Sequence, residues 1–383
     1  MKKNVFGSRV FLVTSLAYMS TAQANSPKPE EGFRLFAGAQ YQSDSNFSRT
    51  HEASEEQIAR AAAGVGYTKS ISAQRLSFKV SASQYKYAEH DELDEESLEG
   101  SASWRSQFSN SISSQLIYDR TETPVDQLEF KGRDMQARQD AIARLSVGDN
   151  RRVGFVVGGH QLRQTHSNIE RRYLDFEDQD VFAETRFKGS GASQVSLRYR
   201  TGERSYEMPE LLSSNLDFDY DQWEIETDWQ LTPKTTLSGL AGYFEREGEN
   251  NNDEGALASM TLSWQTSAKV ATDISYTFNQ PALGESQDAP SEIASSSLML
   301  RWQVTTKIQF IAGGSYTEFE YLNQETSLTR IERNIAVTPA SLEWTVSDAL
   351  RLRLHSQWMD RRSPVIERDY EGHVVTGGLA MVF

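Results

Sequence analysis

Cysteine is absent from this chain of 383 residues, and so is any long apolar run. Without cysteine, neither a disulfide nor a thiolate metal site can form. A transmembrane helix needs about 20 consecutive apolar residues, which no segment supplies, and the mean hydropathy is −0.59. Helical periodicity is also nearly missing beyond the first 24 residues. These absences exclude a disulfide-rich fold and a helical inner-membrane protein.

Positive charge is scarce as well. The chain has 39 Lys and Arg against 54 Asp and Glu, a net charge of −15. Nucleic acid requires a basic face, so it is excluded as a partner. Catalytic motifs are missing too: no His lies in H-E-x-x-H and no Ser in G-x-S-x-G. His355 and Ser356 are chain neighbours, but neighbours on a strand point to opposite faces. We expect no enzyme, no catalytic residue and no cofactor.

The first residues are typical of a secretory signal. Three basic residues precede a short apolar run at 10–19, and Ala22-Gln23-Ala24 forms an A-x-A cleavage site. We therefore predict a signal peptide at 1–24 and a mature domain at 25–383. The signal carries three positive charges and no negative ones, so its removal changes the net charge from −15 to −18.

The mature part shows stretches of about ten residues that alternate between apolar and polar side chains. For example, Leu350, Leu352 and Leu354 alternate with Arg351 and Arg353. This period of two is the pattern of barrel strands, with apolar residues toward lipid and polar residues toward a wet lumen. Eighteen strands are predicted, at 33–42, 58–68, 75–87, 96–107, 111–120, 133–147, 152–165, 173–188, 193–206, 219–232, 235–247, 255–266, 268–279, 292–304, 306–321, 329–346, 349–360 and 372–383.

The connections and the C-terminus favour a membrane barrel over a soluble sandwich. Short turns such as 148–150, 233–234 and 347–348 alternate with longer acidic loops, as periplasmic turns and external loops do. Tyr and Trp gather near strand ends, as interfacial girdles require. The strand that ends at Phe383 resembles the signal read by the outer-membrane barrel-assembly machinery. We predict an all-β, antiparallel, up-and-down transmembrane barrel of about 18 strands with both termini periplasmic, in the outer membrane of a Gram-negative bacterium, against lipid and lipopolysaccharide.

Alternation also predicts which charged side chains line the lumen. A lumen crossed by such charges can select a charged solute, and pairs such as Arg198/Arg200 and Arg351/Arg353 would guide an anion. The alternative is that these charges pair with one another and hold the wall together. The lumen-lining candidates are Arg60, Lys79, Arg105, Arg144, Arg186, Arg198, Arg200, Glu224, Glu226, Asp228, Arg301, Arg351 and Arg353.

The acidic loops suggest no strong metal site. The carboxylates at 89–96, 217–221 and 249–254 offer oxygen ligands that Ca²⁺ or Mg²⁺ prefers. None of these segments follows the EF-hand pattern, so solvated loops are the favoured interpretation and no metal ligand is predicted.

The segment at 33–49 resembles the first hairpin of the β-barrel porin 2 family, which overlaps with the EpsL-type outer-membrane proteins of exopolysaccharide operons. The resemblance rests on Tyr41, Asp44, Asn46 and Phe47, with Ser45 interposed. It implies an outer-membrane exit for an anionic exopolysaccharide, for capsule or biofilm matrix, in a Wzx/Wzy-type pathway with a periplasmic polysaccharide export protein as partner.

Two other functions stay open beside export. One is a general or solute-specific diffusion porin for small nutrients. The candidate loops at 43–57 and 207–218 are modest, which slightly disfavours a narrow eyelet. The other is a structural or adhesive barrel that displays acidic loops.

Overall fold

A computed structural model describes residues 31–189, 191, 193–207, 215–323 and 328–383. The predicted signal peptide at 1–24 lies outside the described residues. No helix among the described residues is long and apolar enough to cross a membrane.

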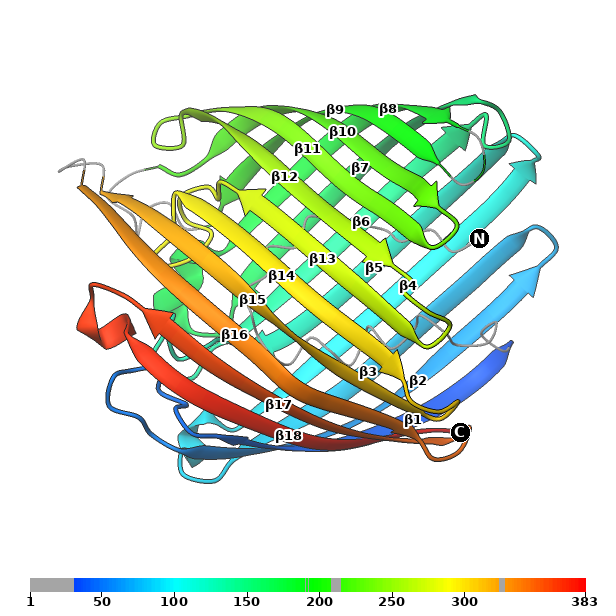
Figure 1. The fold of residues 1–383 in the computed structure, drawn as a ribbon. Helices are drawn as coiled ribbons and strands as arrows, with labels where there is room; N and C mark the ends of the chain where they lie inside the picture. Colours follow the sequence, from blue (N-terminus) through cyan, green and yellow to red (C-terminus); the bar gives the residue numbers. More distant parts are fainter. Residues whose placement is uncertain (1–30, 190, 192, 208–214, 324–327) are drawn as a thin grey trace. The chain divides into compact units, whose positions relative to one another are not determined.

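The described chain folds into one sheet of eighteen strands (Figure 1). All eighteen predicted strands are found, with ends that differ by a few residues. The strands are β1 (Gly32–Asp44), β2 (Glu56–Ile71), β3 (Gln74–Tyr87), β4 (Glu95–Ser109), β5 (Ile112–Pro124), β6 (Met135–Val147), β7 (Val153–His166), β8 (Phe176–Lys188), β9 (Gln194–Tyr206), β10 (Phe218–Thr232), β11 (Thr235–Gly248), β12 (Asp253–Trp264), β13 (Val270–Asn279), β14 (Glu292–Gln303), β15 (Ile308–Asn323), β16 (Leu328–Thr345), β17 (Leu350–Arg362) and β18 (Tyr370–Val382).

Each strand pairs antiparallel with its neighbours in the chain, and β1 pairs with β18, so the sheet closes on itself. At this seam the Phe383 N–H donates to the Leu35 carbonyl at 2.8 Å, and the Leu35 N–H donates to the Phe383 carbonyl at 3.1 Å. Closure leaves no unpaired edge, which is what a spanning sheet requires because lipid cannot satisfy backbone groups. The predicted fold class is therefore confirmed as a closed, antiparallel, 18-stranded barrel.

The connections define two different ends. Short turns such as 72–73 and 233–234 join strands at the end where β1 begins and β18 ends, here called the turn end. Longer segments such as 45–55, 125–134 and 280–291 join strands at the opposite end, here called the loop end. Short 3₁₀ helices at the loop end are η2 (Asp91–Leu93), η3 (Ile169–Leu174) and η5 (Ile366–Arg368).

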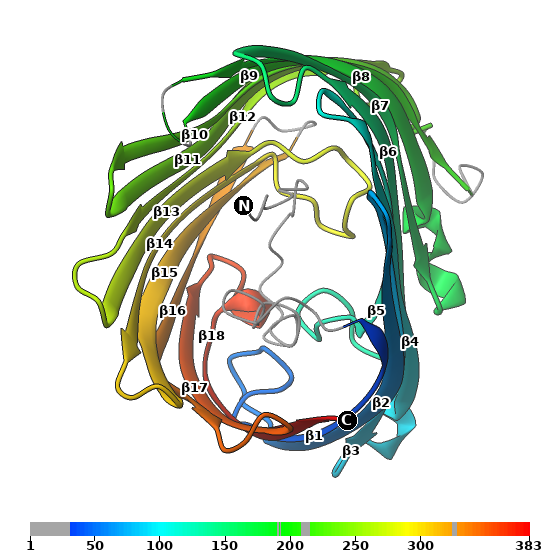
Figure 2. The same cartoon turned by 90° about the vertical axis from the view of Figure 1, so that its right-hand side faces the viewer.

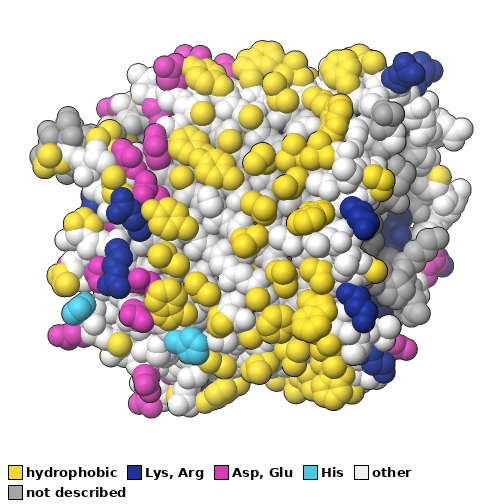
Figure 3. Space-filling view, in the orientation of Figure 1, with side chains coloured by type: hydrophobic (Ala, Val, Ile, Leu, Met, Phe, Trp, Pro, Cys, Tyr) yellow, Lys and Arg dark blue, Asp and Glu magenta, His cyan; other side chains and the backbone are white. Residues whose placement is uncertain are grey.

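The wall is apolar outside and charged inside. Trp223, Trp264 and Trp302 point outward and are 53 %, 49 % and 44 % exposed, whereas Glu224 and Arg60 point inward and are 3 % and 6 % exposed. Figure 3 shows apolar side chains across the middle of one face, with charged side chains gathered near the two ends. A soluble sandwich would bury the apolar set, so this inverted arrangement matches a barrel in lipid.

The residues that suggested the family resemblance have a structural task in the loop after β1. Asp44 accepts from Arg49 at 2.9 Å, and the Asn46 amide donates to Thr50 O at 2.8 Å and to Glu371 O at 2.9 Å. Both side chains are 1 % exposed. They fold the loop and tie it to β18, across the seam of the barrel.

Candidate functional site: the barrel lumen

The inner face of the wall collects the charged side chains of the strands. In β9, Leu197 is 44 % exposed on the outside, so the alternation turns Arg198 and Arg200 toward the lumen. The same alternation places all thirteen candidates on the inner face: Arg60, Lys79, Arg105, Arg144, Arg186, Arg198, Arg200, Glu224, Glu226, Asp228, Arg301, Arg351 and Arg353.

Arg198 is the centre of an ion-pair network on β8, β9 and β10. Its guanidinium lies 2.6 Å from Glu184, 2.8 Å from Glu224 and 3.1 Å from Glu226. Arg200 lies 2.8 Å from Asp180. These arginines are matched by carboxylates on neighbouring strands, so the pair Arg198/Arg200 holds the wall together rather than presenting free positive charge.

The network continues toward the loop end in a second group. His160 lies 2.9 Å from Asp180, and Arg204 lies 2.8 Å from Asp178, whose other oxygen accepts from the Tyr220 hydroxyl at 2.8 Å. His160, Asp178 and Asp180 hold ligand atoms within 4.8 Å of one another, the one such trio among the described residues. Both carboxylates already face an arginine, which opposes a cation there, so the trio is better explained as an ion-pair network.

A different part of the lumen carries arginines without acidic partners. Four residues follow one another in register across neighbouring strands. Arg75 on β3 lies opposite Arg105 on β4, and Arg105 lies opposite Gln115 on β5. Gln115 in turn lies opposite Arg144 on β6. Arg144 donates to Gln115 at 2.8 Å. Within the described part of the chain, no carboxylate lies within 4.0 Å of these three guanidiniums. Hydrogen-bonded rows climb around a barrel because its strands tilt, so the three arginines form an oblique basic row on the wall.

Loop 280–291 narrows the lumen at the loop end. Leu283 packs against a buried cluster on β7 to β9 that also includes Leu216, just before β10, and its carbonyl accepts from the Tyr206 hydroxyl at 2.8 Å. Glu285 accepts from Arg204 at 2.7 Å. Figure 2 shows this loop, between β13 and β14, extending across the opening. Burial opposes ionisation of Glu285, but Arg204 holds the pKa of this carboxyl below its ordinary value.

A second loop, 125–134, also turns inward. Leu128 packs against the buried cluster of Ala336, Met359, Tyr370 and Val374 on β16 to β18. Asp126 lies 3.5 Å from Arg49, and Lys131 donates to the Ser48 carbonyl. Burial lowers the pKa of Lys131. The sequence singled out neither this loop nor 280–291, because their contacts are with strands distant in the chain.

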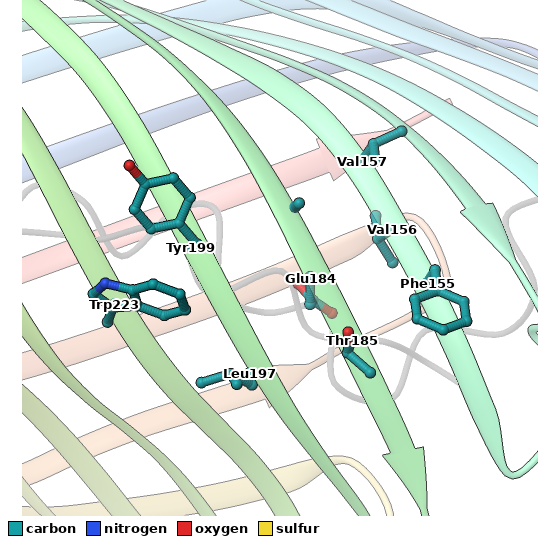
Figure 4. A pocket seen from close by; sticks show the side chains of 9 residues that line it. Phe155, Val156, Val157, Glu184, Thr185, Leu197, Tyr199 and Trp223 are labelled. Atoms are coloured by element: carbon teal, nitrogen blue, oxygen red, sulfur yellow. The ribbon is translucent and has the colours of Figure 1, made fainter.

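Two hollows lie on the outer wall of the barrel. One of about 190 Å³ is lined by outward side chains from β7 to β10, including Phe155, Val157, Tyr199 and Trp223 (Figure 4). Another, of about 860 Å³, is lined by Leu116, Val181 and further residues of β5 to β10. The smaller hollow is mainly apolar and would meet lipid, whereas the larger one also includes Gln161, Glu203 and Asp219. The lumen, where the charged side chains gather, is the candidate site.

No family model matches the chain, and no curated protein matches it either. Solved structures match over almost its whole length. They include the outer membrane protein OpdK from Pseudomonas aeruginosa (7 % identity, TM-score 0.52, 92 % of this chain and 99 % of that one) and a BenF-like porin from Pseudomonas fluorescens Pf-5 (8 %, 0.52, 92 % and 98 %). The chain has the fold of an outer-membrane porin. A third match, Pseudomonas aeruginosa OccK2 (OpdF), was crystallised in complex with glucuronate (10 %, 0.52, 92 % and 96 %).

The comparisons correct the functional prediction. Polysaccharide export, inferred from the first hairpin, is contradicted, because the structural neighbours are the outer membrane protein OpdK, OccK2, OccAB3 and a BenF-like porin. Two of the four residues behind that inference also have a local structural role, since Asp44 and Asn46 fold the loop that follows β1. The diffusion porin, previously the alternative, is the function that these neighbours favour.

Proposed function

We propose that the chain is an outer-membrane diffusion channel for small water-soluble solutes. The observation that carries the proposal is the closed barrel with a charged lumen that loop 280–291 narrows at one end. An eyelet of this kind passes small molecules and retains large ones. Non-enzymatic passage also agrees with the lack of catalytic motifs in the sequence.

The proposed orientation places the turn end, where β1 begins and β18 ends, together with both termini in the periplasm, and the loop end outside the cell. Short periplasmic turns and longer external loops are the rule in such barrels. Residues 1–24 are proposed as the cleaved signal peptide, and Phe383 as the contact for the barrel-assembly machinery. Lipid and lipopolysaccharide are proposed to surround the outer wall. The family resemblance of residues 33–49 stays a prediction, whereas the export protein and polysaccharide are dropped with the export function.

The proposed solutes are small anions. Arg75, Arg105 and Arg144 form a row without acidic partners among the described residues, and such a row attracts negative charge along the wall. Arg351, on β17, likewise has no carboxylate within 4.0 Å in the described part of the chain, although Arg353 lies 3.6 Å from Glu343. Sugar acids such as glucuronate, which a structural neighbour binds, belong to this class.

Reconstitution of the purified full chain in lipid tests the proposal. We expect ion conductance in planar bilayers, and uptake of glucuronate into liposomes that exceeds uptake of larger oligosaccharides. In the triple variant R75Q/R105Q/R144Q, the preference for anions over cations should fall several-fold. The matched control R151Q/R152Q/K234Q removes three charges from the turns and should keep the preference. A barrel without conductance would contradict the channel, and equal effects of the two variants would contradict the basic row.

A further inference from the structure

Three arginines converge on one buried carboxylate at the loop end of β16 and β17. Arg361 and Arg368 donate to Glu332 at 3.0 and 2.9 Å, and Arg330 Nε lies 3.2 Å from the same carboxylate. The Tyr321 hydroxyl accepts from Arg361 at 3.2 Å and from Arg368 at 3.1 Å. Glu332 neutralises only one of the three guanidiniums. We call Arg330, Arg361, Arg368, Glu332 and Tyr321 the arginine site.

Loop 280–291 supplies a second carboxylate to the arginine site. Asp288 pairs with Arg330, and its Oδ2 lies 3.4 Å from Arg368. The Asp288 side chain is 42 % exposed, whereas the side chains of Glu332 and Arg361 are 0 % and 5 % exposed. Asp288 is therefore the outermost anion of the site, and it comes from a loop instead of the wall. With three guanidiniums and these two carboxylates, the arginine site together with Asp288 keeps a net charge of +1.

The same loop has a second anchor on the other side of its path. Glu285 pairs with Arg204 on β9, and Leu283 packs into the apolar cluster there. Asp288 pairs instead with Arg330 of β16 and with Arg368 of η5. Because the loop spans these two parts of the wall, loss of the Asp288 pair would free one side of the loop while Glu285 and Leu283 keep the other side in place.

We propose that the arginine site binds small oxyanions and that Asp288 is its resident, tethered anion. A solute carboxylate or phosphate in the lumen takes the place of Asp288 and frees that side of loop 280–291. The guanidinium fork fits the two oxygens of either group. A tethered group competes at an effective concentration on the order of millimolar, so solute anions in that range displace it. The inference rests on the proposed channel function, because the anion reaches the site through the lumen.

The absence of cysteine makes the test direct. Ala289, half-buried and next to Asp288, is replaced by cysteine, which becomes the only thiol of the chain. The purified full-length barrel is then labelled with a maleimide. We expect the labelling rate to rise several-fold as sodium glucuronate replaces sodium chloride at constant ionic strength, and to stay unchanged with glucose. A parallel series with inorganic phosphate decides between the two oxyanions, and acceleration by either one supports the site.

Two variants separate the site from general effects. In D288N/A289C the resident carboxylate is gone, so its cysteine should react fast with maleimide even without an added anion. Glucuronate or phosphate should then not raise the labelling rate further. D253N/A289C removes an exposed carboxylate that lies 3.4 Å from Arg246 at the same end of the barrel, and it should behave like the parent. Heat-dependent gel mobility checks that each barrel is folded, and D288A replaces D288N if the latter does not fold.

Two results would overturn the inference: a parent rate that neither glucuronate nor phosphate changes, or slow labelling of D288N/A289C. Bilayer conductance is recorded on the same preparations. A conducting barrel without the anion response contradicts the arginine site alone. A barrel with the anion response but without conductance contradicts the channel function alone.

Discussion

Replacing Arg198 by methionine tests the ion-pair network of β8, β9 and β10. The change keeps much of the side-chain volume but leaves three carboxylates without their shared partner. Glu184 and Glu224 are only 4 % and 3 % exposed. Removing one partner of a buried ion pair costs about 3–5 kcal/mol. Because the Arg198 side chain is 16 % exposed, we expect the lower end, about 3 kcal/mol of unfolding free energy.

The control is the same substitution at Arg301. This arginine lies 2.6 Å from one carboxylate, Asp273, and its side chain is 42 % exposed. Exposed pairs contribute about 0–1 kcal/mol, so R301M should cost at most about 1 kcal/mol.

The assay is urea unfolding of the barrel in lipid vesicles, followed by tryptophan fluorescence. With a slope of about 1–3 kcal/mol per molar urea, the midpoint of R198M should fall by about 1 M or more. A midpoint for R198M equal to that of R301M would refute the reasoning, because burial and partner number would then have no effect.

Three further predictions concern other parts of the barrel. Glu332→Gln leaves buried Arg361 without a charged partner and leaves Arg330 and Arg368 with Asp288 alone, so it should cost about 3–5 kcal/mol in the same urea assay. A loss below about 1 kcal/mol would contradict this role of Glu332. A spin label on Gln287→Cys should stay immobile from neutral pH down to about 4.5, the ordinary pKa of Glu, and become mobile only as pH falls through the depressed pKa of Glu285. A label that is already mobile at pH 6 would show that the Glu285–Arg204 ion pair does not anchor loop 280–291. Gly158→Ala places a Cβ 2.5 Å from the Phe182 ring, so it should lower the free energy of unfolding by about 1–3 kcal/mol. An unchanged urea midpoint would contradict this prediction.

Strands and faces could be predicted from sequence because both depend on a local period of two. The example of Leu350 to Arg353 needs only chain neighbours to assign a face. The period of two does not fix where a strand begins: the segment predicted as a strand from residue 173 starts within the end of η3, and β8 starts at Phe176. Within β16, Pro339 has no N–H, and the register shifts between Val337 and Ala340.

The narrowing of the lumen was not predictable in this way. Loop 280–291 is rich in Ala, Gly, Pro and Ser and has no period. Its inward path depends on contacts of Leu283 and Glu285 with β7 to β9, and on the pairing of Asp288 with Arg330 of β16. The sequence likewise left open whether Arg198 and Arg200 pair with carboxylates or present free positive charge to a solute. The registers of β8 to β10 decide this, because they place Glu184 and Glu224 opposite Arg198.

The seam between β1 and β18 has a consequence for the order of folding. Every other pair joins strands that follow each other in the chain, but the seam brings Phe36 to Val382. Closing a loop of that length costs about 5 kcal/mol of chain entropy beyond a constant, so the hairpins form before the ring does. Phe383 also takes part in the seam, through its two backbone hydrogen bonds with Leu35. The ring is therefore complete only when β18 has reached β1, after the seventeen hairpin contacts between consecutive strands. A circular permutant that joins the present ends and opens the 305–306 turn would move this late step to β14 and β15.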